Sequence, residues 1–335
     1  MKVGTSTVNL YAFLHRMIQE NDVANQSIIK GFLLMGFSSD HNLQMMYFLI
    51  FLSIYLIALI GNFLIIATVA LNYSLHTPMY GFLVNLSIID VCYITTIVPK
   101  TISVCFMGNN LISFFGCVAQ IFSVMVFVGA EISLLTVMAY DRYVAICHPL
   151  QYRLIMNWKT CIYMATAFWS ISVIHAVLET TVTFSLSFCG PNILEQFFCD
   201  VPSLLKISCT NTQVNKVIVF VIGSIVNSFC ILFISVSYGY IFSTVLRIPA
   251  DQGRYKVFST CIPHMTVSTL FVTTALFSHM KPSGLSSPMV NLLSGVLYTV
   301  LPPMLNPIIY CLRNKEIQEA MWKILKKYNF HTIFS

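Results

Sequence analysis

The feature that most constrains this chain is a series of long apolar stretches. Each is long enough to cross a lipid bilayer as a helix, which takes about 20 apolar residues. Seven follow one another along the sequence, over residues 45–71, 78–99, 113–140, 160–185, 215–245, 257–280 and 287–311. Lipid offers the backbone no hydrogen-bond partners, so helices are stable there and open sheets are not. The sequence therefore predicts an all-α fold, a bundle of seven transmembrane helices spanning residues 45–311.

The composition favours the same interpretation. Asp, Glu, Lys and Arg make up only 9% of the 335 residues, and 57% of the residues are hydrophobic. A soluble domain carries about 25% charged residues, which cover its surface in water. This chain is therefore expected to face membrane lipid over much of its length. It has no Lys/Arg run dense enough to bind nucleic acid, so no nucleic-acid partner is predicted.

Two tails flank the predicted bundle, an N-terminal tail over residues 1–44 and a cytoplasmic tail over residues 312–335. Residues 314–327 of the second tail read NKEIQEAMWKILKK. Their apolar and charged residues recur at helical spacing on opposite faces, with Ile317, Met321, Ile324 and Leu325 against Lys315, Glu319, Lys323 and Lys326. This pattern predicts a short amphipathic helix that lies on the membrane surface.

Lys and Arg in the loops indicate how the bundle is oriented. With the N-terminus outside, eleven of the 18 fall on the cytoplasmic side and seven on the outer side. An excess of positive charge in cytoplasmic loops is the expected direction. The N-terminal tail is then extracellular, which makes the sequon at Asn25 a candidate glycosylation site.

The third apolar stretch ends in an acid-base pair. Residues 138–152 read MAYDRYVAICHPLQY, and Asp141 and Arg142 stand side by side at the predicted membrane boundary. A charged pair costs much less at the interface than at mid-bilayer, so it can serve as a simple anchor. The alternative is a switch, in which Asp141 holds Arg142 in one state and releases it towards a partner protein in another.

Two carboxylates lie well inside predicted spans, Asp90 in the second and Glu131 in the third, while Glu179 lies near the outer end of the fourth. A buried acid is costly unless it is paired, protonated or bound to a cation. The structural interpretation is a hydrogen bond to Asn62, Asn306 or Ser133. The functional interpretation is a shared site for a sodium ion or a proton that favours the inactive state.

Eleven cysteines occur, without a CxxC pair or zinc-finger spacing. Four of them lie near or in polar segments predicted to be outside: Cys117, Cys189, Cys199 and Cys209. Disulfides persist on that oxidising side. Four cysteines allow three pairings, and spacing alone does not choose among them.

Several motifs occur together in order. Gly61-Asn62, LSIID at 86–90, Ser237-Tyr238 and PMLNPIIY at 303–310 resemble the rhodopsin-like G-protein-coupled receptors. Three further stretches narrow the resemblance to the olfactory (odorant) receptor family, namely LHTPMY at 75–80, MAYDRYVAICHPLQY at 138–152 and KVFSTC at 256–261. The resemblance covers about residues 25–320.

The resemblance implies an odorant-activated receptor that couples to a stimulatory G protein and raises cyclic AMP, in the ciliary plasma membrane of olfactory neurons. No cofactor is implied. Arg142 would engage the G protein, and Tyr238 and Tyr310 would rearrange around it. The implied coupling set is Asp141, Arg142, Tyr143, Tyr238, Asn306, Pro307 and Tyr310. The resemblance also implies that Asp90, Glu131 and Asn306 lie close together, and it selects disulfides Cys117–Cys199 and Cys189–Cys209.

A ligand pocket is predicted between the third helix and the fifth, sixth and seventh helices. One face of the third helix carries Val124, Met125, Val128, Gly129 and Ile132. The resemblance places Ile222, Gly223 and Val226 of the fifth helix opposite them. The candidates to close the ring are Val272, Ala275, Leu276 and His279 of the sixth helix and Val296 and Thr299 of the seventh. The lining is mostly apolar, as suits a small hydrophobic ligand. For each of these residues, ordinary bundle packing is the competing interpretation.

Three other functions were weighed. A transporter or channel could use Asp90 and Glu131 as an ion path, but such proteins often contain repeats, and the sequence has none. A retinal-binding photoreceptor needs a Lys in the seventh span, and residues 287–311 contain none. An enzyme is disfavoured because no nucleophile elbow or metal-ligand constellation occurs.

Overall fold

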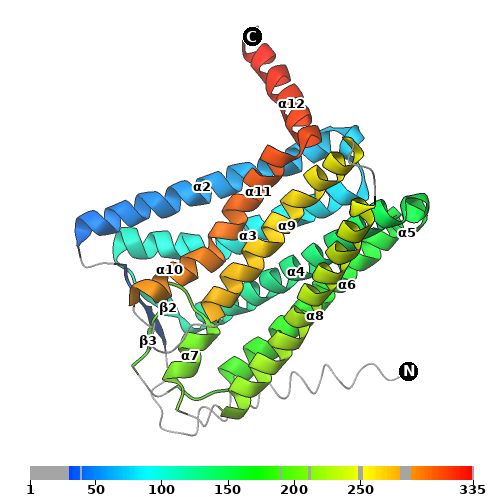
Figure 1. Cartoon of the computed structure of the whole chain (residues 1–335). Helices are drawn as coiled ribbons and strands as arrows, with labels where there is room; N and C mark the ends of the chain where they lie inside the picture. Colours follow the sequence, from blue (N-terminus) through cyan, green and yellow to red (C-terminus); the bar gives the residue numbers. More distant parts are fainter. Residues whose placement is uncertain are drawn as a thin grey trace, which may run out of the picture.

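The computed structural model describes residues 30–37, 40–188, 191–209, 213–247, 252–279 and 288–333. Figure 1 shows long helices that run side by side as a bundle. The helices are α2 (His41–Leu71), α3 (Pro78–Met107), α4 (Phe114–Cys147), α6 (Trp158–Phe184), α8 (Gln213–Leu246), α9 (Gln252–His279), α10 (Pro288–Thr299) and α11 (Leu301–Arg313). Within the described ranges, seven spans are long and apolar enough to cross a membrane. The predicted fold class is confirmed.

Several helix boundaries differ from the prediction. The third span was expected to end at residue 140, but α4 continues to Cys147, so Asp141 and Arg142 lie within its last turns. The second span was expected to end at residue 99, but α3 continues through Pro99 to Met107 and ends at Gly108, whose φ of 64° suits glycine. Lys100 does not end the helix, because its Nζ reaches the loop and donates to the carbonyls of Asn109 and Leu111 at 3.0 and 2.7 Å.

The seventh span was expected to be one helix over residues 287–311. Instead α10 ends at Thr299, and α11 begins at Leu301. Two prolines, Pro302 and Pro303, occupy the first turn of α11. Proline donates no backbone hydrogen bond, so the ladder is interrupted at this point and a new helix starts there.

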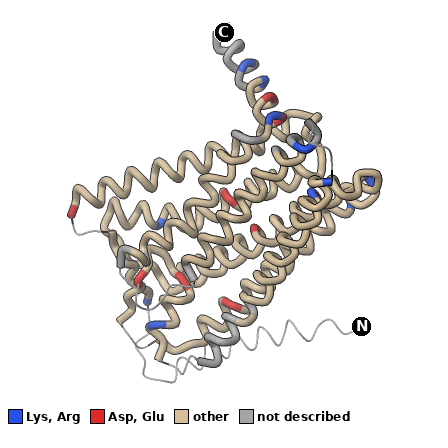
Figure 2. Tube along the Cα trace, in the orientation of Figure 1, with Lys and Arg blue, Asp and Glu red and all other residues tan. Residues whose placement is uncertain are grey.

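The short elements gather at the two ends of the bundle. One end, called here the sheet end, carries β1 (Gly31–Leu34), β2 (Leu111–Ser113), β3 (Ile193–Leu194) and α7 (Val201–Ile207). The other, called the α12 end, carries the 3-10 turns Tyr73–Leu75 and Pro149–Gln151, α5 (Tyr152–Ile155) and α12 (Lys315–Ile333). Figure 2 shows Lys and Arg positions gathered where α12 begins.

The sheet was not predicted. Its strand order is β2-β1-β3, with Phe32 opposite Ile112 in the antiparallel pair and Leu33 opposite Ile193 in the parallel pair. Phe32 is fully buried and belongs to a cluster that includes Cys117. Residues of the N-terminal tail are thereby packed against loops at this end of the bundle.

The amphipathic pattern of the tail is confirmed in α12, which leaves the bundle at the end of α11 (Figure 1). Ile317 is fully buried, whereas Lys315, Glu319 and Lys323 are exposed. The helix packs against α2 and α11. Helix α4 lies centrally, in contact with α3, α6, α8 and α9, and contributes to the largest hydrophobic cluster.

Candidate functional site

The acid-base pair at the α12 end of α4 is closed in this structure. Arg142 Nη2 donates to Asp141 Oδ2 at 2.8 Å, and the hydroxyl of Tyr152 donates to Asp141 Oδ1 at 2.9 Å. Asp141 is buried and the Arg142 side chain is only 13% exposed. Both carboxylate oxygens are thus occupied, which holds Arg142 against its own helix.

Tyr152 is a site residue that the sequence reasoning missed. It is the last residue of the stretch MAYDRYVAICHPLQY and begins α5. Burial, followed by the negative charge of Asp141, raises the pKa of Tyr152 above its ordinary value. The hydroxyl therefore stays protonated at physiological pH and remains a donor to Asp141.

A second polar chain joins three helices near the same end. The Tyr238 hydroxyl on α8 lies 2.7 Å from His264 Nδ1 on α9, and His264 Nε2 lies 3.0 Å from the Leu135 carbonyl oxygen on α4. A carbonyl only accepts, so Nε2 carries the proton and Nδ1 accepts from Tyr238. His264 was not predicted, although a lone buried histidine in an apolar span was the available signal.

Two other members of the implied coupling set do not touch Asp141. The Tyr143 hydroxyl lies 3.0 Å from His148 Nε2, beyond the end of α4. Tyr310 is buried on α11, and its hydroxyl has no hydrogen-bond partner among the described residues. Pro307 also packs closely, because a Cβ added at Gly61 would lie 3.0 Å from its ring.

The buried acids meet around one amide. Asn306 Nδ2 donates to both carboxylate oxygens of Asp90 at 3.1 Å and to Glu131 Oε1 at 3.4 Å. All three side chains are buried. Of the three partners weighed from the sequence, Asn306 is the one bonded to these acids. Asn62 instead donates to the carbonyls of Ala58 and Pro303 at 3.0 Å.

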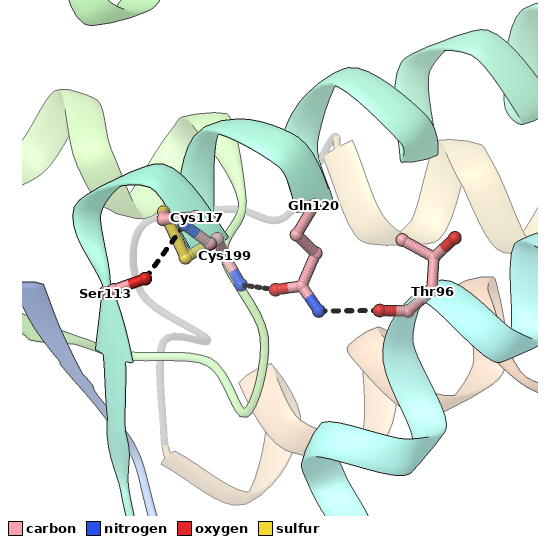
Figure 3. The surroundings of a disulfide bond; sticks show 6 residues. Thr96, Ser113, Cys117, Gln120 and Cys199 are labelled. Carbon is pink, nitrogen blue, oxygen red and sulfur yellow. Dashed lines mark hydrogen bonds between the residues drawn. A yellow bond between two sulfur atoms is a disulfide. The ribbon is translucent and has the colours of Figure 1, made fainter.

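At the sheet end a disulfide joins Cys117 to Cys199, the pair that the resemblance implies, with Cα atoms 5.5 Å apart (Figure 3). Ser113 caps the start of α4 beside it. Gln120 adds a second link that was not predicted: its Oε1 accepts from the Cys199 amide at 2.8 Å, and its Nε2 donates to the Thr96 carbonyl at 3.0 Å (Figure 3). The loop between α6 and α8 is therefore fixed to both α4 and α3.

The second predicted pairing falls partly on a residue that the structure does not describe. Cys209 is disulfide-bonded, and its amide donates to the Ser187 carbonyl at 3.0 Å. Cys189 lies outside the described residues. The Cys189–Cys209 bond therefore stays a prediction, and the candidate glycosylation site at Asn25 also lies outside the described ranges.

The predicted ligand-binding residues are spread over different environments. Val124 and Val128 pack with Tyr93 and with Phe197 and Phe198 of the loop after β3. Met125 packs beside the disulfide, while Ile132 and Val272 belong to the large cluster. The remaining members that face other helices or the loop are Val226, Ala275, Val296 and Thr299, all partly or fully buried.

The other predicted ligand-binding residues do not line a shared site in the described structure. Gly129 faces α6, because a Cβ there would lie 3.2 Å from Ser172 Oγ, so its small size serves helix packing. Leu276 is 48% exposed and does not lie in the bundle core. The side chains of Ile222 and His279 are outside the described part of the structure. A cavity of about 100 Å³ lies elsewhere, lined by Gly36, Phe37, Gln44, Val104, Cys105, Gly108 and Asn110.

Comparison with known proteins identifies the family. The family model described as olfactory receptor matches residues 51–328. The chain belongs to the olfactory receptor family. Olfactory receptor 14A16 of Homo sapiens is 45% identical over 304 residues, which cover 91% of this chain and 98% of that protein. Olfactory receptor 14A2 of Homo sapiens is 46% identical over 305 residues, covering 91% and 97%.

A solved structure agrees on the architecture. Squid rhodopsin superimposes with a TM-score of 0.65 at 18% identity, covering 87% of each chain. This likeness bears on the fold, which is that of a seven-helix receptor. Membership of the olfactory receptor family makes the chain a multi-pass membrane receptor that signals through a G protein in response to a small molecule, and not an enzyme.

Proposed function

We propose that this olfactory receptor binds small, mostly hydrophobic odorants within its helical bundle and activates a stimulatory G protein, which raises cyclic AMP. The observation that carries the proposal is the closed Asp141–Arg142–Tyr152 contact at the end of a membrane-crossing helix. A buried arginine held by a neighbouring acid is available for a partner protein once that contact opens. The proposed location is the ciliary membrane of olfactory neurons.

The proposed orientation places the sheet end outside and the α12 end in the cytoplasm. The excess of Lys and Arg on the latter side supports it. The N-terminal tail, with Asn25, is then extracellular and open to glycosylation. The Cys117–Cys199 disulfide also falls on the oxidising side, where such bonds persist.

Activation is proposed to begin when the ligand, bound in the outer half of the bundle, moves α9 away from α4. The chain from Tyr238 through His264 to the Leu135 carbonyl crosses α8, α9 and α4. If α9 moves away from α4, this chain of hydrogen bonds breaks. The Tyr238–His264 and His264–Leu135 bonds, 2.7 and 3.0 Å long, form only when the helices are close together. Tyr238 is then free to turn towards Tyr310 and Arg142, and the released Arg142 binds the G protein.

The Asp90–Asn306–Glu131 cluster is proposed to hold a sodium ion or a proton that favours the inactive state. The donor set suits a hard cation, which prefers oxygen ligands. Glu131 Oε2 and Asn306 Oδ1 are buried and have no hydrogen-bond partner in the described part of the chain. Two adjacent carboxylates also repel each other unless a cation or proton lies between them.

The test is a panel of small odorants applied to cells that express the full chain at a measured surface level, with a cyclic AMP reporter. The expected result is a dose-dependent rise for a subset of mostly apolar molecules, absent from cells without the receptor. A ligand that stabilises the receptor against heat in membranes yet leaves cyclic AMP unchanged would argue for another G protein.

A further inference from the structure

A third buried carboxylate, Glu179, lies outside the networks described above. It stands near the sheet end of α6 on the same helix face as Ser172, Ala176 and Thr183, at steps of three and four residues. All four are buried, and Glu179 is only 6% exposed. An acid on the inward face of a membrane helix is costly, so it needs a partner of its own.

The pairing of Glu179 inside the protein is incomplete. The basic side chain beside it is His175, whose Nε2 lies 3.6 Å from Glu179 Oε1, beyond hydrogen-bonding distance. His175 Nε2 has no hydrogen-bond partner among the described residues, and neither do the buried hydroxyls of Thr180 and Thr183 on the same helix. The end of α6 thus collects polar atoms that the rest of the described chain does not satisfy.

The residue of α8 that faces the carboxylate carries no side chain. Gly223 faces Glu179, and a Cβ placed there would meet Oε1 at 3.5 Å, an ordinary van der Waals contact. Anything larger than a methyl group at this position would occupy the space in front of the carboxylate.

We propose that Glu179 binds the ammonium group of a primary-amine ligand, whose hydrocarbon chain lies among the apolar residues between α4 and α8. This rests on the proposed function, since it names the ligand class of that receptor. An ammonium supplies a compensating charge and three N–H donors, which a buried carboxylate needs more than it needs a neutral hydroxyl. His175 and the Thr183 hydroxyl, each one turn from Glu179 along α6, are the groups proposed to complete the hydrogen bonding of the head group.

The experiment compares three ligands of equal chain length: a straight-chain primary alkylamine, the corresponding alcohol and the corresponding alkane. Each is tested on the full receptor for cyclic AMP and, separately, for protection of the receptor against heat in isolated membranes. The amine is expected to be the most potent. Glu179→Gln keeps the shape and removes the charge, and it should lower amine potency by about 10- to 100-fold while leaving the alcohol within about threefold.

Glu195→Gln is the matched control. Glu195 is an exposed acid at the same end of the bundle and is paired with Lys206 at 2.6 Å. Its substitution tests whether any negative charge at the sheet end attracts amines. Its amine potency should stay close to that of the parent receptor. An equal loss in both variants, or an unchanged amine response in Glu179→Gln, would overturn the proposal.

The two readouts separate this inference from the proposed function. If alcohols raise cyclic AMP while amines neither activate nor protect, the coupling stands and the amine proposal fails. If amines protect without raising cyclic AMP, the binding proposal stands and the coupling fails. Should Glu179→Gln not reach the surface, Gly223→Leu replaces it: amine protection should fall while Gly223→Ala keeps it, and equal protection in both variants would refute the proposal.

Discussion

Two buried carboxylates towards opposite ends of the bundle, Asp141 and Glu179, differ in how they are partnered. At the α12 end both oxygens of Asp141 have donors, and His264 bonds through both ring nitrogens. At the sheet end Glu179 and His175 stand 3.6 Å apart with polar atoms left unsatisfied in the described chain. Satisfied networks hold one arrangement, whereas unsatisfied groups gain free energy from an added molecule. The difference supports the two proposals made above, in which Asp141 holds the resting state and Glu179 binds a ligand.

A covalent bond holds the elements of the sheet end together, whereas the elements of the α12 end are held by hydrogen bonds. The Cys117–Cys199 disulfide closes a loop with a sequence separation of 82, worth about 4 kcal/mol in the chain-entropy treatment. Cys117→Ser or Cys199→Ser should therefore retain most receptor inside the cell, the largest effect expected here. Surface labelling measures it. Cys105→Ser, which removes a buried free thiol, is the control and should be milder.

A direct chemical check accompanies this variant. Non-reducing peptide mapping of surface receptor should recover the Cys117–Cys199 link and, as a prediction, Cys189–Cys209. Free thiols at Cys117 and Cys199 in a surface-expressed, ligand-responsive receptor would contradict the assignment.

Substituting Arg142 is the most direct way to disrupt the closed contact at the α12 end. Arg142→Ala removes the group proposed to bind the G protein but leaves Tyr152 bonded to Asp141. We expect normal surface expression and loss of agonist-driven cyclic AMP, by about 100-fold or to background, since a buried charged contact with a partner contributes several kcal/mol. Arg153→Ala changes an exposed basic residue of α5 and serves as control. Full signalling by Arg142→Ala at matched surface levels would remove Arg142 from coupling.

Asp90 and Glu131 lie between the two ends of the bundle. Substituting them tests whether buried charge in the middle of the bundle also controls the resting state. Asp90→Asn and Glu131→Gln keep the shape and remove one charge each. We expect loss of sodium sensitivity, raised basal cyclic AMP and a roughly tenfold change in agonist potency, which corresponds to about 1.4 kcal/mol. Glu319→Gln on the exposed face of α12 is the control. If basal activity, potency and sodium response all match the parent receptor, the acids are structural.

The sequence predicted features that depend on neighbours along the chain. Apolar length decides the spans, and Asp141 and Arg142 are adjacent in sequence, so their ion pair needed no knowledge of the fold. Two distant contacts, the Cys117–Cys199 disulfide and the Asp90–Asn306–Glu131 cluster, came from the family resemblance. Other contacts between distant elements were not predicted, such as Tyr152 with Asp141 or His264 with the Leu135 carbonyl. The sheet was missed because its strands are only two to four residues long.

The pocket illustrates the same limit. Helical periodicity indicates that Val124, Val128 and Gly129 lie near one face of α4, but it does not say which helix opposes each residue. In the structure Val124 and Val128 meet Phe197 of the loop, whereas Gly129 meets Ser172 of α6. Glu179 was noted as an acid near a helix end, and only its burial and its distance from His175 identify it as a candidate binding group.

The smallest expected effect comes from a single hydrogen bond in the closed Asp141–Arg142–Tyr152 contact. Tyr152→Phe removes the hydroxyl that donates to Asp141 Oδ1 and leaves the Asp141–Arg142 pair, 2.8 Å long, in place. Arg142 still balances the charge of the carboxylate, so the loss is taken as that of an ordinary hydrogen bond, about 0.5–1.5 kcal/mol, and losing it only from the resting state shifts the equilibrium towards activity. Basal cyclic AMP should rise by about two- to tenfold at equal surface expression, with agonist efficacy retained.

Because burial keeps the pKa of Tyr152 high, the difference between the parent receptor and the variant should not change between pH 6 and 8. Tyr73→Phe, at an exposed tyrosine on the same end, is the control, and unchanged basal activity in Tyr152→Phe would mean that Asp141 holds Arg142 without this second donor.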